Sequence, residues 1–348
     1  MMTKSPPHVN QAPSRRVTSY DVASLAGVSQ SAVSRCFKPG ASVSKSTYAR
    51  VMQAAQQLDY TPNAAARSLI TRRSRQVALI ISNAATLHFP EVLSDMSRQF
   101  GLQGMRILLF ALPSEGEMGA ILADVWQHQI DGALVAARLA PAQMAEFEKR
   151  GIPVVLFNRH LDQPNVNAIV CDQGAAARLI VSRLAQAGHR RFALIEGPPD
   201  SVIAQERRRG ACAQLSTLGL PAPLVVSGNY DYASGARGMR AIVRQLGSAP
   251  DAIVCGNDVM AIGCLDTARH EMGLDVPGRL SITGFDGVSQ ASWLSYQLTT
   301  LRQPMQAMVM AACRLLGALI LDGSARPQQR VYADTVVEGA TARLGPAD

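Results

Sequence analysis

The sequence predicts an all-α helix-turn-helix head, a hinge helix, and an α/β body built from two parallel-sheet subdomains. Three observations support this fold class. The excess positive charge lies in the first 76 residues, where two short amphipathic helices flank a glycine. Beyond them, apolar β-branched runs recur at intervals that leave room for one helix between strands. One interval is too short for that pattern, which indicates that the body is divided.

The charge of the chain is unevenly distributed. Of the 348 residues, the first 76 hold eleven Lys and Arg but only two Asp, whereas the rest hold 23 basic and 24 acidic residues. A basic block of this kind suits a folded module that faces a polyanion, and the alternative is a solvated tail. Residues 1–15, rich in Pro, Ser and Gln, are expected to form a flexible tail.

Composition argues against export and membrane insertion. The N-terminus lacks the apolar core of a signal peptide, and the most apolar run (305–321) is interrupted by Gln306 and Arg314. The six cysteines form no C-x-x-C pair. We therefore expect reduced thiols, no metal site, no membrane partner and a cytoplasmic location.

Residues 17–37 predict a helix-turn-helix. Thr18 or Ser19 can cap the first helix, Gly27 allows the positive φ that ends it, and Ser29 can cap the second. Ala23, four residues before Gly27, and Val33, six after it, fit a small residue at the helix crossing and a branched one beneath the second helix. The apolar stripes comprise Val22, Leu25, Ala26, Val33 and Phe37, and a third helix is expected over 45–58.

The second helix of such a motif lies in the DNA major groove, with its N-terminal side chains at the base edges. Gln pairs with adenine and Arg with guanine in two-bond contacts, whereas hydroxyl and basic groups bind phosphates. The candidate DNA-contacting residues of the head are Thr18, Tyr20, Ser29, Gln30, Ser31, Arg35 and Ser44.

Residues 76 onward alternate between strands and helices. The expected strands are 76–82, 106–112, 131–137, 152–158, 167–172, 191–197, 222–228, 251–258 and 280–286. Most successive starts lie 20 to 31 residues apart, which implies parallel sheets covered on both faces. The exception is the 15-residue step from 152 to 167, where we expect the chain to pass from one subdomain to the other.

Polar residues follow several of these strands, notably Asn158, Asp172, Asn257 and Asp286. The carboxyl ends of parallel strands form the ligand-binding edge of such sheets. Each residue alone could instead cap the next helix. Together they suit a small polyhydroxylated ligand.

At this point a family resemblance becomes clear. SYDVASLAGVSQSAVSRCF, followed by YTPNAAARSL, resembles the DNA-binding head and hinge of the lactose-repressor/galactose-repressor (LacI/GalR) family of bacterial transcription regulators, and the likeness extends over roughly 17–345. It implies a body like that of periplasmic sugar-binding proteins. The implied domains are a helix-turn-helix domain (16–61), a hinge helix and linker (62–75), and an effector-binding and dimerisation domain (76–348). Within the last, the implied subdomains are about 76–171 plus 303–331 and about 172–302 plus 332–348.

The resemblance also implies functional residues. In the hinge, Leu69 would be a wedge inserted into the minor groove, with Asn63 and Ala66 along that groove. RRRG, CGND and GFD would place effector contacts at Arg207, Asn257 and Asp286. The remaining implied effector contacts are Asn83, Phe89, Asn158, Asp172 and Tyr230, the last stacking on the ligand.

Two features of the body leave alternatives open. Arg208 and Arg209 stand beside Arg207; if one turns inward, an anionic effector such as a sugar acid or sugar phosphate is favoured, and otherwise both are solvated. Trp293 and Tyr296 could wall the pocket or belong to the core.

The implied function is a transcription regulator, most simply a repressor. Its operator affinity would be set by a small polar effector between the subdomains, a carbohydrate or sugar acid. It would act as a homodimer on a palindromic operator at the nucleoid. The sequence shows no GxGxxG, P-loop or GxSxG motif, so we expect neither catalysis nor a cofactor. The alternative is a ligand-binding module without specific operator binding. Effector identity, operator sequence, regulated genes and the sign of the response stay open.

Overall fold

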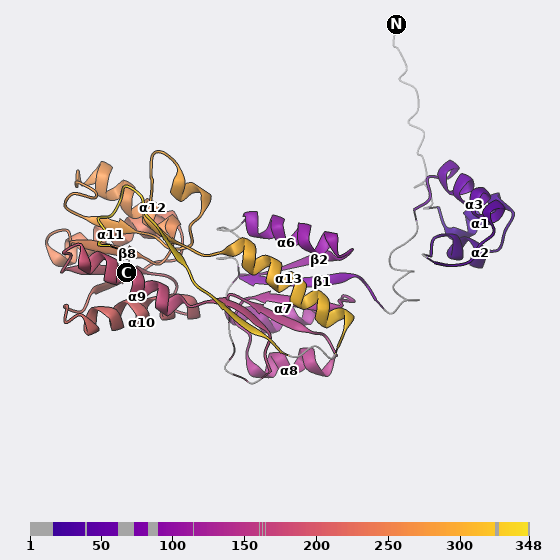
Figure 1. Ribbon diagram of the computed structural model, residues 1–348, viewed down its shortest axis with the longest axis horizontal. Coiled ribbons are helices and arrows are strands. Elements are labelled where there is room, and N and C mark those ends of the chain that lie inside the picture. Colours follow the sequence, from indigo (N-terminus) through magenta and orange to yellow (C-terminus); the bar gives the residue numbers. More distant parts are fainter. Residues whose placement is uncertain are drawn as a thin grey trace, which may run out of the picture. The chain divides into compact units, whose positions relative to one another are not determined.

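The computed structural model describes residues 17–38, 40–61, 73–82, 90–113, 115–159, 161, 163, 165–323 and 327–346. The chain divides into two compact units, 1–74 and 75–348 (Figure 1). Five residues named above as candidate contacts, Asn63, Ala66, Leu69, Asn83 and Phe89, lie outside the described residues.

The head consists of α1 (Ser19–Ala26), α2 (Gln30–Cys36) and α3 (Lys45–Gln57). The Thr18 backbone N–H and hydroxyl both donate to Asp21 Oδ2, at 2.8 and 2.7 Å, and Gly27 ends α1 at a φ of 62°. The Ser29 and Ser44 hydroxyls cap α2 and α3. These contacts satisfy backbone donors that the first turn of a helix leaves open.

The core of the head contains Ala23 and Val33, as the spacing predicted, together with Val22, Ala26, Val51, Ala54 and Ala55. Leu25 does not join it. Its side chain is 52% exposed, so its place in the predicted apolar stripe is wrong. Phe37 and Tyr60 close the core edge to face, with ring centroids 5.8 Å apart.

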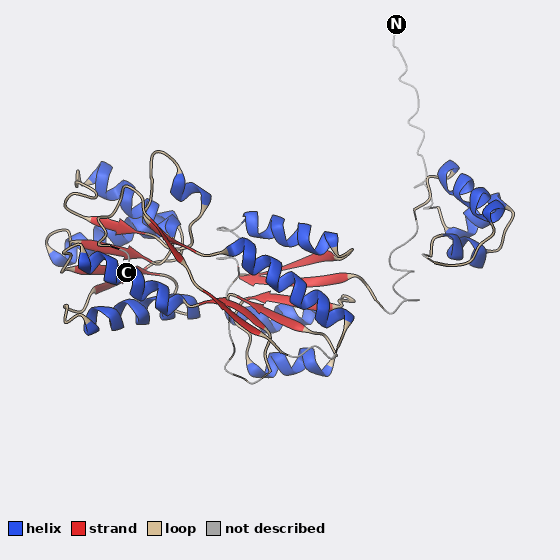
Figure 2. Ribbon diagram, viewed as in Figure 1, coloured by secondary structure: helices blue, strands red, loops and turns tan. Residues whose placement is uncertain are grey.

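The first lobe of the body, called the N-lobe below, is built on a six-stranded parallel sheet (Figure 2). Its order is β11 (Gln329–Tyr332), β5 (Ala168–Cys171), β4 (Val154–Phe157), β3 (Gly132–Ala136), β1 (Gln76–Ser82) and β2 (Arg106–Leu112). Helices α6 (Pro90–Leu102) and α13 (Met305–Leu321) cover one face, and α7 (Met118–Val125) and α8 (Pro141–Lys149) cover the other.

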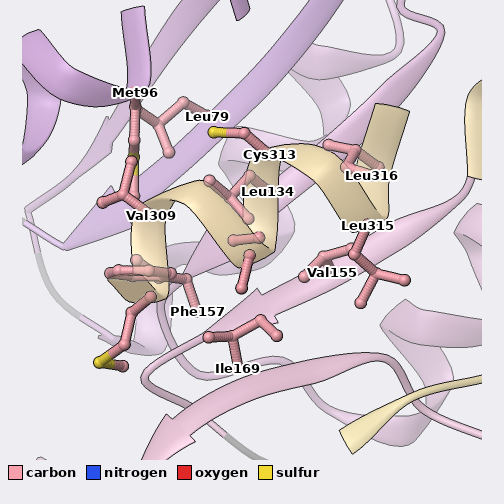
Figure 3. Close-up of a cluster of buried hydrophobic side chains, with 14 of the residues drawn as sticks. Leu79, Met96, Leu134, Val155, Phe157, Ile169, Val309, Cys313, Leu315 and Leu316 are labelled. Atoms are coloured by element: carbon pink, nitrogen blue, oxygen red, sulfur yellow. The ribbon is translucent and has the colours of Figure 1, made fainter. Parts of the chain in front are cut away.

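Helix α13 supplies much of the N-lobe core. Val309, Cys313 and Leu316 point from it toward apolar side chains of the sheet, including Leu134 and Phe157 (Figure 3). The helix is apolar enough to be almost wholly buried on the sheet side but carries Arg314 on its exposed side. Among the described residues, no helix combines the length and apolarity needed to span a membrane.

The second lobe, the C-lobe, is built on a four-stranded parallel sheet in the order β7 (Leu224–Ser227), β6 (Phe192–Glu196), β8 (Ala252–Cys255) and β9 (Ser281–Thr283). Helices α9 (Gln173–Gln186) and α10 (Val202–Thr217) cover one face, and α11 (Tyr232–Leu246) and α12 (Asp258–Asp266) cover the other. A π-helical turn, Thr267–Glu271, follows α12.

Both helix pairs of the C-lobe cross at glycines. A Cβ at Gly210 of α10 would lie 2.4 Å from the Gly174 carbonyl oxygen of α9. A Cβ at Gly235 of α11 would lie 2.0 Å from the Met260 carbonyl oxygen, and one at Gly263 of α12 would lie 2.1 Å from that of Tyr232. The helices therefore pack backbone to backbone.

Along its described residues, the chain passes between the lobes three times: after β5, after β10 (Thr300–Arg302), and between β11 and β12 (Thr335–Val337). β10 and β12 pair antiparallel. The expectation that the short step between residues 152 and 167 marks a passage is wrong, because β4 and β5 are neighbours in one sheet, with Leu156 opposite Ala168. The passage comes one strand later, at Asp172.

Candidate functional site: a basic helix-turn-helix face and an interlobe hydrogen-bond ring

The head presents several of the predicted DNA contacts to solvent. Tyr20 is 70% exposed, and Ser31 and Arg35 are exposed one turn apart on α2. Gln30 is half-buried, and its Nε2 donates to Ser19 Oγ at 3.3 Å. That contact ties the start of α2 to α1 and orients the amide that the sequence assigned to base reading.

Thr18, Ser29 and Ser44 have structural roles in the head. Ser29 Oγ accepts from the Ala32 N–H at 3.3 Å and lies 2.9 Å from Ser31 Oγ. Ser44 Oγ accepts from the Thr47 N–H at 3.2 Å. Ser29 and Ser44 are nevertheless exposed, so capping leaves their outer faces open.

In the body, Arg207 is the best-connected of the predicted effector residues. It is buried on α10, and its Nε donates to Gln173 Oε1 at 2.8 Å, while one terminal nitrogen donates to Asp286 Oδ1 at 2.7 Å. The other terminal nitrogen donates to the Gly256 carbonyl at 2.5 Å. The guanidinium carbon also lies 3.5 Å from the centroid of the Phe285 ring, a cation–π contact.

These bonds belong to a closed ring of five side chains, called the interlobe ring below. Asn158 Nδ2 donates to Gln303 Oε1 at 2.7 Å, and Gln303 Nε2 donates to Asp286 Oδ1 at 2.8 Å. On the other side, Gln173 Nε2 donates to Asn158 Oδ1 at 3.1 Å. Arg207 completes the circuit by donating to Gln173 and to Asp286. Asn158 follows β4 of the N-lobe, whereas Arg207 and Asp286 belong to the C-lobe.

Sequence reasoning missed Gln173 and Gln303. Gln173 follows a predicted strand-end residue, and Gln303 precedes the proline that starts α13. Both are almost completely buried, at 2% and 3% exposure. A buried glutamine needs partners for its amide, but the sequence offered no sign of burial at these positions.

Several of the effector candidates have an unusual backbone conformation. Asn158, Tyr230 and Asp286 all have positive φ, of 50°, 58° and 108°. Such values are uncommon outside glycine and persist where the surrounding structure fixes them, often at binding sites. Three of the six described effector candidates therefore share an unusual conformation.

Asn257 and Tyr230 lie together beside the ring. Asn257, 1% exposed, caps α12 by accepting from the Met260 N–H at 2.9 Å, and it donates to the Tyr230 carbonyl at 3.2 Å. The Tyr230 hydroxyl lies 3.2 Å from Ser201 Oγ, and its ring fills the space where a Cβ of Gly197 would be. Burial raises the pKa of Tyr230.

Asp172 is not part of the interlobe ring. It is exposed, and its Oδ1 accepts from the Ala175 N–H at 2.7 Å, which is helix capping. Asp172 and Asn257 thus both cap helices, and Asn257 in addition donates to the carbonyl of Tyr230, another effector candidate.

Two buried carboxyl groups border the ring. Burial raises the pKa of Asp258 to about 7, although Thr300 and the Val288 N–H donate to it. Burial also raises the pKa of Asp334, at the third passage, to about 6. Neither oxygen of Asp334 has a well-aligned hydrogen-bond partner, and the neighbouring Cys171 thiol lowers this pKa less than burial raises it.

Both flanking arginines are exposed, as the solvated alternative predicted, whereas the two flanking aromatic residues differ from each other. Arg208 pairs with Glu196 at 3.5 Å, and Arg209 is exposed on α10. Trp293 is 55% exposed and stacks on Tyr296, with ring centroids 6.4 Å apart. The expectation of core packing is therefore wrong for Trp293, whereas Tyr296 packs partly against the C-lobe core. In the described residues, no cluster of three His, Cys, Asp or Glu could hold a metal ion.

Together, a helix-turn-helix with an exposed polar face and a two-lobed α/β body with a polar interlobe site define a ligand-responsive DNA-binding regulator. Comparisons with known proteins agree. Residues 18–63 match the signature of the lacI family of bacterial regulatory proteins, and residues 181–342 match that of the periplasmic binding protein-like domain. The chain belongs to the LacI family: it is a transcriptional repressor with an effector-binding domain, and not an enzyme.

The relatives span nearly the whole chain. The HTH-type transcriptional repressor PurR of Klebsiella pneumoniae (strain 342) is 29% identical over 335 residues, covering 94% of this chain and 98% of PurR. A lac repressor dimer bound to operator and the anti-inducer ONPF superimposes with a TM-score of 0.84 at 25% identity, covering 94% and 99%. A CelR–cellobiose complex is 28% identical, with a TM-score of 0.68 and coverage of 94% and 100%.

Proposed function

We propose that this repressor binds an uncharged sugar or sugar derivative at the interlobe ring, and that the bound sugar sets its operator affinity. The observation that carries the proposal is the ring itself, in which Arg207 and Asp286 of one lobe are joined through two glutamines to Asn158 of the other. A ligand that replaces any of these bonds changes what holds the lobes together.

The donor inventory of the ring supports a sugar. A guanidinium has five N–H donors, and three nitrogens of Arg207 each already donate one, so two donors are left for a ligand. Asp286 Oδ1 accepts two bonds, which leaves Oδ2 as an acceptor. Paired donors and an acceptor suit vicinal hydroxyl groups. The relative described as a complex with cellobiose fits this ligand class.

The charge of the site favours an uncharged ligand over a sugar acid. Arg207 is already neutralised by Asp286 at 2.7 Å, and Arg208 is paired with Glu196. Binding an anion would bring negative charge next to Asp286 and the two nearby carboxyl groups, Asp258 and Asp334. We therefore propose an uncharged sugar as the effector, in place of the sugar acid or sugar phosphate that the sequence left open.

The proposed domain layout follows the sheets. The strands of the N-lobe sheet lie within 76–171 and 303–331 apart from Tyr332, and those of the C-lobe sheet lie within 172–302. Residues 16–61 would bind DNA, and 62–75 would form the hinge helix. A ligand acts through its different affinity for two arrangements of the lobes, a coupling that is typically about 1–3 kcal/mol.

A homodimer on a palindromic operator, at the bacterial nucleoid, completes the proposal. One helix-turn-helix reads a half-site, so two-fold symmetry of the protein matches that of the operator. Large apolar side chains are exposed on each lobe, Leu102 and Leu109 on one and Trp293 and Leu294 on the other. Covering them with a second copy removes apolar surface from water. Sedimentation of Leu294→Glu should show more monomer than the wild-type chain, and an unchanged dimer would remove this surface from the interface.

The test of the function has two arms. A thermal-shift screen of neutral sugars, sugar acids and nucleobases on the full chain should give its largest stabilisation with a neutral sugar. A gel-shift assay on a palindromic promoter fragment, with and without that sugar, should show a change in operator affinity and reveal whether the effector releases DNA or promotes binding. Absence of any shift under both conditions would leave only a ligand-binding module.

A further inference from the structure

A hollow with a volume of about 450 Å³ lies beside the interlobe ring. Its walls come from the end of β5, from β11, and from the facing sides of α9 and α10. Of the effector candidates, Asp172 lines it, whereas Arg207, Tyr230, Asn257 and Asp286 do not. The volume is in the range of pockets that hold small molecules.

The hollow arises from how two helices meet. Residues 206, 209, 210 and 213 of α10 line it, a spacing that places them on one face of that helix. Gly210 touches Gly174 of α9 backbone to backbone, and Arg178 stands one turn further along α9. The close crossing brings Arg178 and Arg209, on different helices, to the same hollow.

Two arginines and two carboxylates line this hollow. Asp172 accepts the Ala175 N–H and so caps α9, and Glu206 also has an interaction of its own. By contrast, Arg178 and Arg209 have no ion-pair or hydrogen-bond partner within the described part of the chain. The neighbouring arginines of α10 differ, since Arg207 is bonded to the ring and Arg208 to Glu196.

An apolar wall stands next to these cations. Val331 of β11 is 67% exposed although it pairs with Val170 of β5, and both line the hollow with Ala213. A valine this exposed on a strand gains from contact with an apolar ligand. Gln173 also lines the hollow, so a ligand here would border a member of the interlobe ring.

We propose that this hollow is a second ligand site, which takes a small oxyanion joined to an apolar group. Arg178 and Arg209 bind the oxyanion from two sides, because guanidinium groups match phosphate and carboxylate oxygens with paired N–H donors. Val170 and Val331 contact the apolar part. The site is separate from the sugar site, and its ligand adjoins Gln173.

The experiment is calorimetric titration of the full-length chain with phenyl phosphate, benzoate and inorganic phosphate. Arg178→Ala and Arg209→Ala should each weaken phenyl phosphate binding by roughly tenfold or more, the worth of a charge-assisted hydrogen bond. Arg208→Ala is the matched control, because it removes the adjacent cation of α10 and should leave the affinity unchanged. The basic head is the same in every variant, so anions bound there do not affect the comparison.

The three probes test the two halves of the site separately. Phenyl phosphate or benzoate should bind more tightly than inorganic phosphate, and the better of the two identifies the oxyanion. Wild-type affinity in Arg178→Ala and Arg209→Ala, or equal losses in all three arginine variants, would overturn the site. Equal affinity for inorganic and phenyl phosphate would overturn the apolar contact. Arg178 and Arg209 are exposed, and circular dichroism of the variants checks that they fold.

Discussion

The Arg207 guanidinium and the Asp286 carboxylate lie 2.7 Å apart, and each side chain is about 7% exposed. The pair is thus a buried ion pair with few water contacts. Each partner is also bonded to a glutamine, and both glutamines end on Asn158. Gln173 and Gln303 therefore connect this ion pair of the C-lobe to the side-chain amide of Asn158 in the N-lobe.

Removing Arg207 should therefore affect both stability and response. Arg207→Ala leaves Asp286 buried without its counter-ion, which typically costs about 3–5 kcal/mol. We expect the urea midpoint to fall, the effector response to vanish and operator binding to survive in the folded dimer. Arg207→Ala combined with Asp286→Asn should regain part of the stability but not the response. Loss of operator binding in a folded Arg207→Ala dimer would contradict the site assignment.

Gln30 should contribute to operator sequence reading. Its amide is oriented by Ser19, so Gln30→Ala removes a positioned group from the start of α2. A good two-bond contact with a base is worth about 1–3 kcal/mol of discrimination. Operator affinity should fall by that amount in a gel shift, while affinity for unrelated DNA stays the same. An equal loss on both DNAs would make Gln30 a structural residue of the head.

Leu69→Ser tests the hinge that the family resemblance implies. Loss of an inserted leucine removes about 1.5–3 kcal/mol of apolar burial. Operator affinity should drop accordingly, whereas effector affinity, measured by calorimetry, should hardly change. A variant with wild-type operator affinity would reduce this segment to a plain linker.

The stability of the body should fall as the pH rises. The pKa of Asp258 is raised to about 7 and that of Asp334 to about 6, both by burial, whereas an unfolded aspartate titrates near 4. The folded state then binds more protons than the unfolded state, so this stability is lost as pH increases through those values. Urea midpoints should decrease between about pH 4 and about pH 7, the interval between the unfolded and the folded pKa values, and should level off above it. The slope should be shallower in Asp334→Asn, and an identical slope would exclude Asp334 as a contributor.

The glycine crossings predict a sharp contrast between two alanine substitutions. Gly235→Ala places a methyl group 2.0 Å from the Met260 carbonyl oxygen and should cost about 1–3 kcal/mol or more, because backbone cannot move aside cheaply. Gly119→Ala in α7 meets nothing within 4 Å and should be neutral or stabilise by up to about 1 kcal/mol. Thermal unfolding of both variants measures the difference.

Local chemistry explains why much of the fold could be predicted. Gly27, Ser29 and Val33 act through neighbours in sequence, so their spacing was enough to place two helices and a turn. The strands were readable as apolar runs because both faces of a parallel sheet are covered. The passage between lobes was misplaced because a short connection can also join neighbouring strands, as it joins β4 to β5.

The candidate site was less predictable. Arg207 and Asp286 could be predicted as site residues from family motifs. The roles of Gln173 and Gln303 depend on contacts with residues that are distant in the chain, and sequence spacing does not predict such contacts. Gln303 lies 145 positions from its partner Asn158. Leu25 is a case in which the sequence predicted a core contact that does not form. Helical periodicity placed it in the core, but no neighbouring element in the described part of the head covers it and its side chain is 52% exposed.

The glycine crossings of the C-lobe also bear on how a signal can leave the sugar site. With α9 against α10 and α11 against α12 in backbone contact, this lobe has little slack to absorb a local displacement. A displacement at the carboxyl end of one strand would therefore move the whole lobe as a rigid body. The compliant parts of the body are then the three connecting passages, so amide exchange on ligand binding should change there while the crossing helices stay protected.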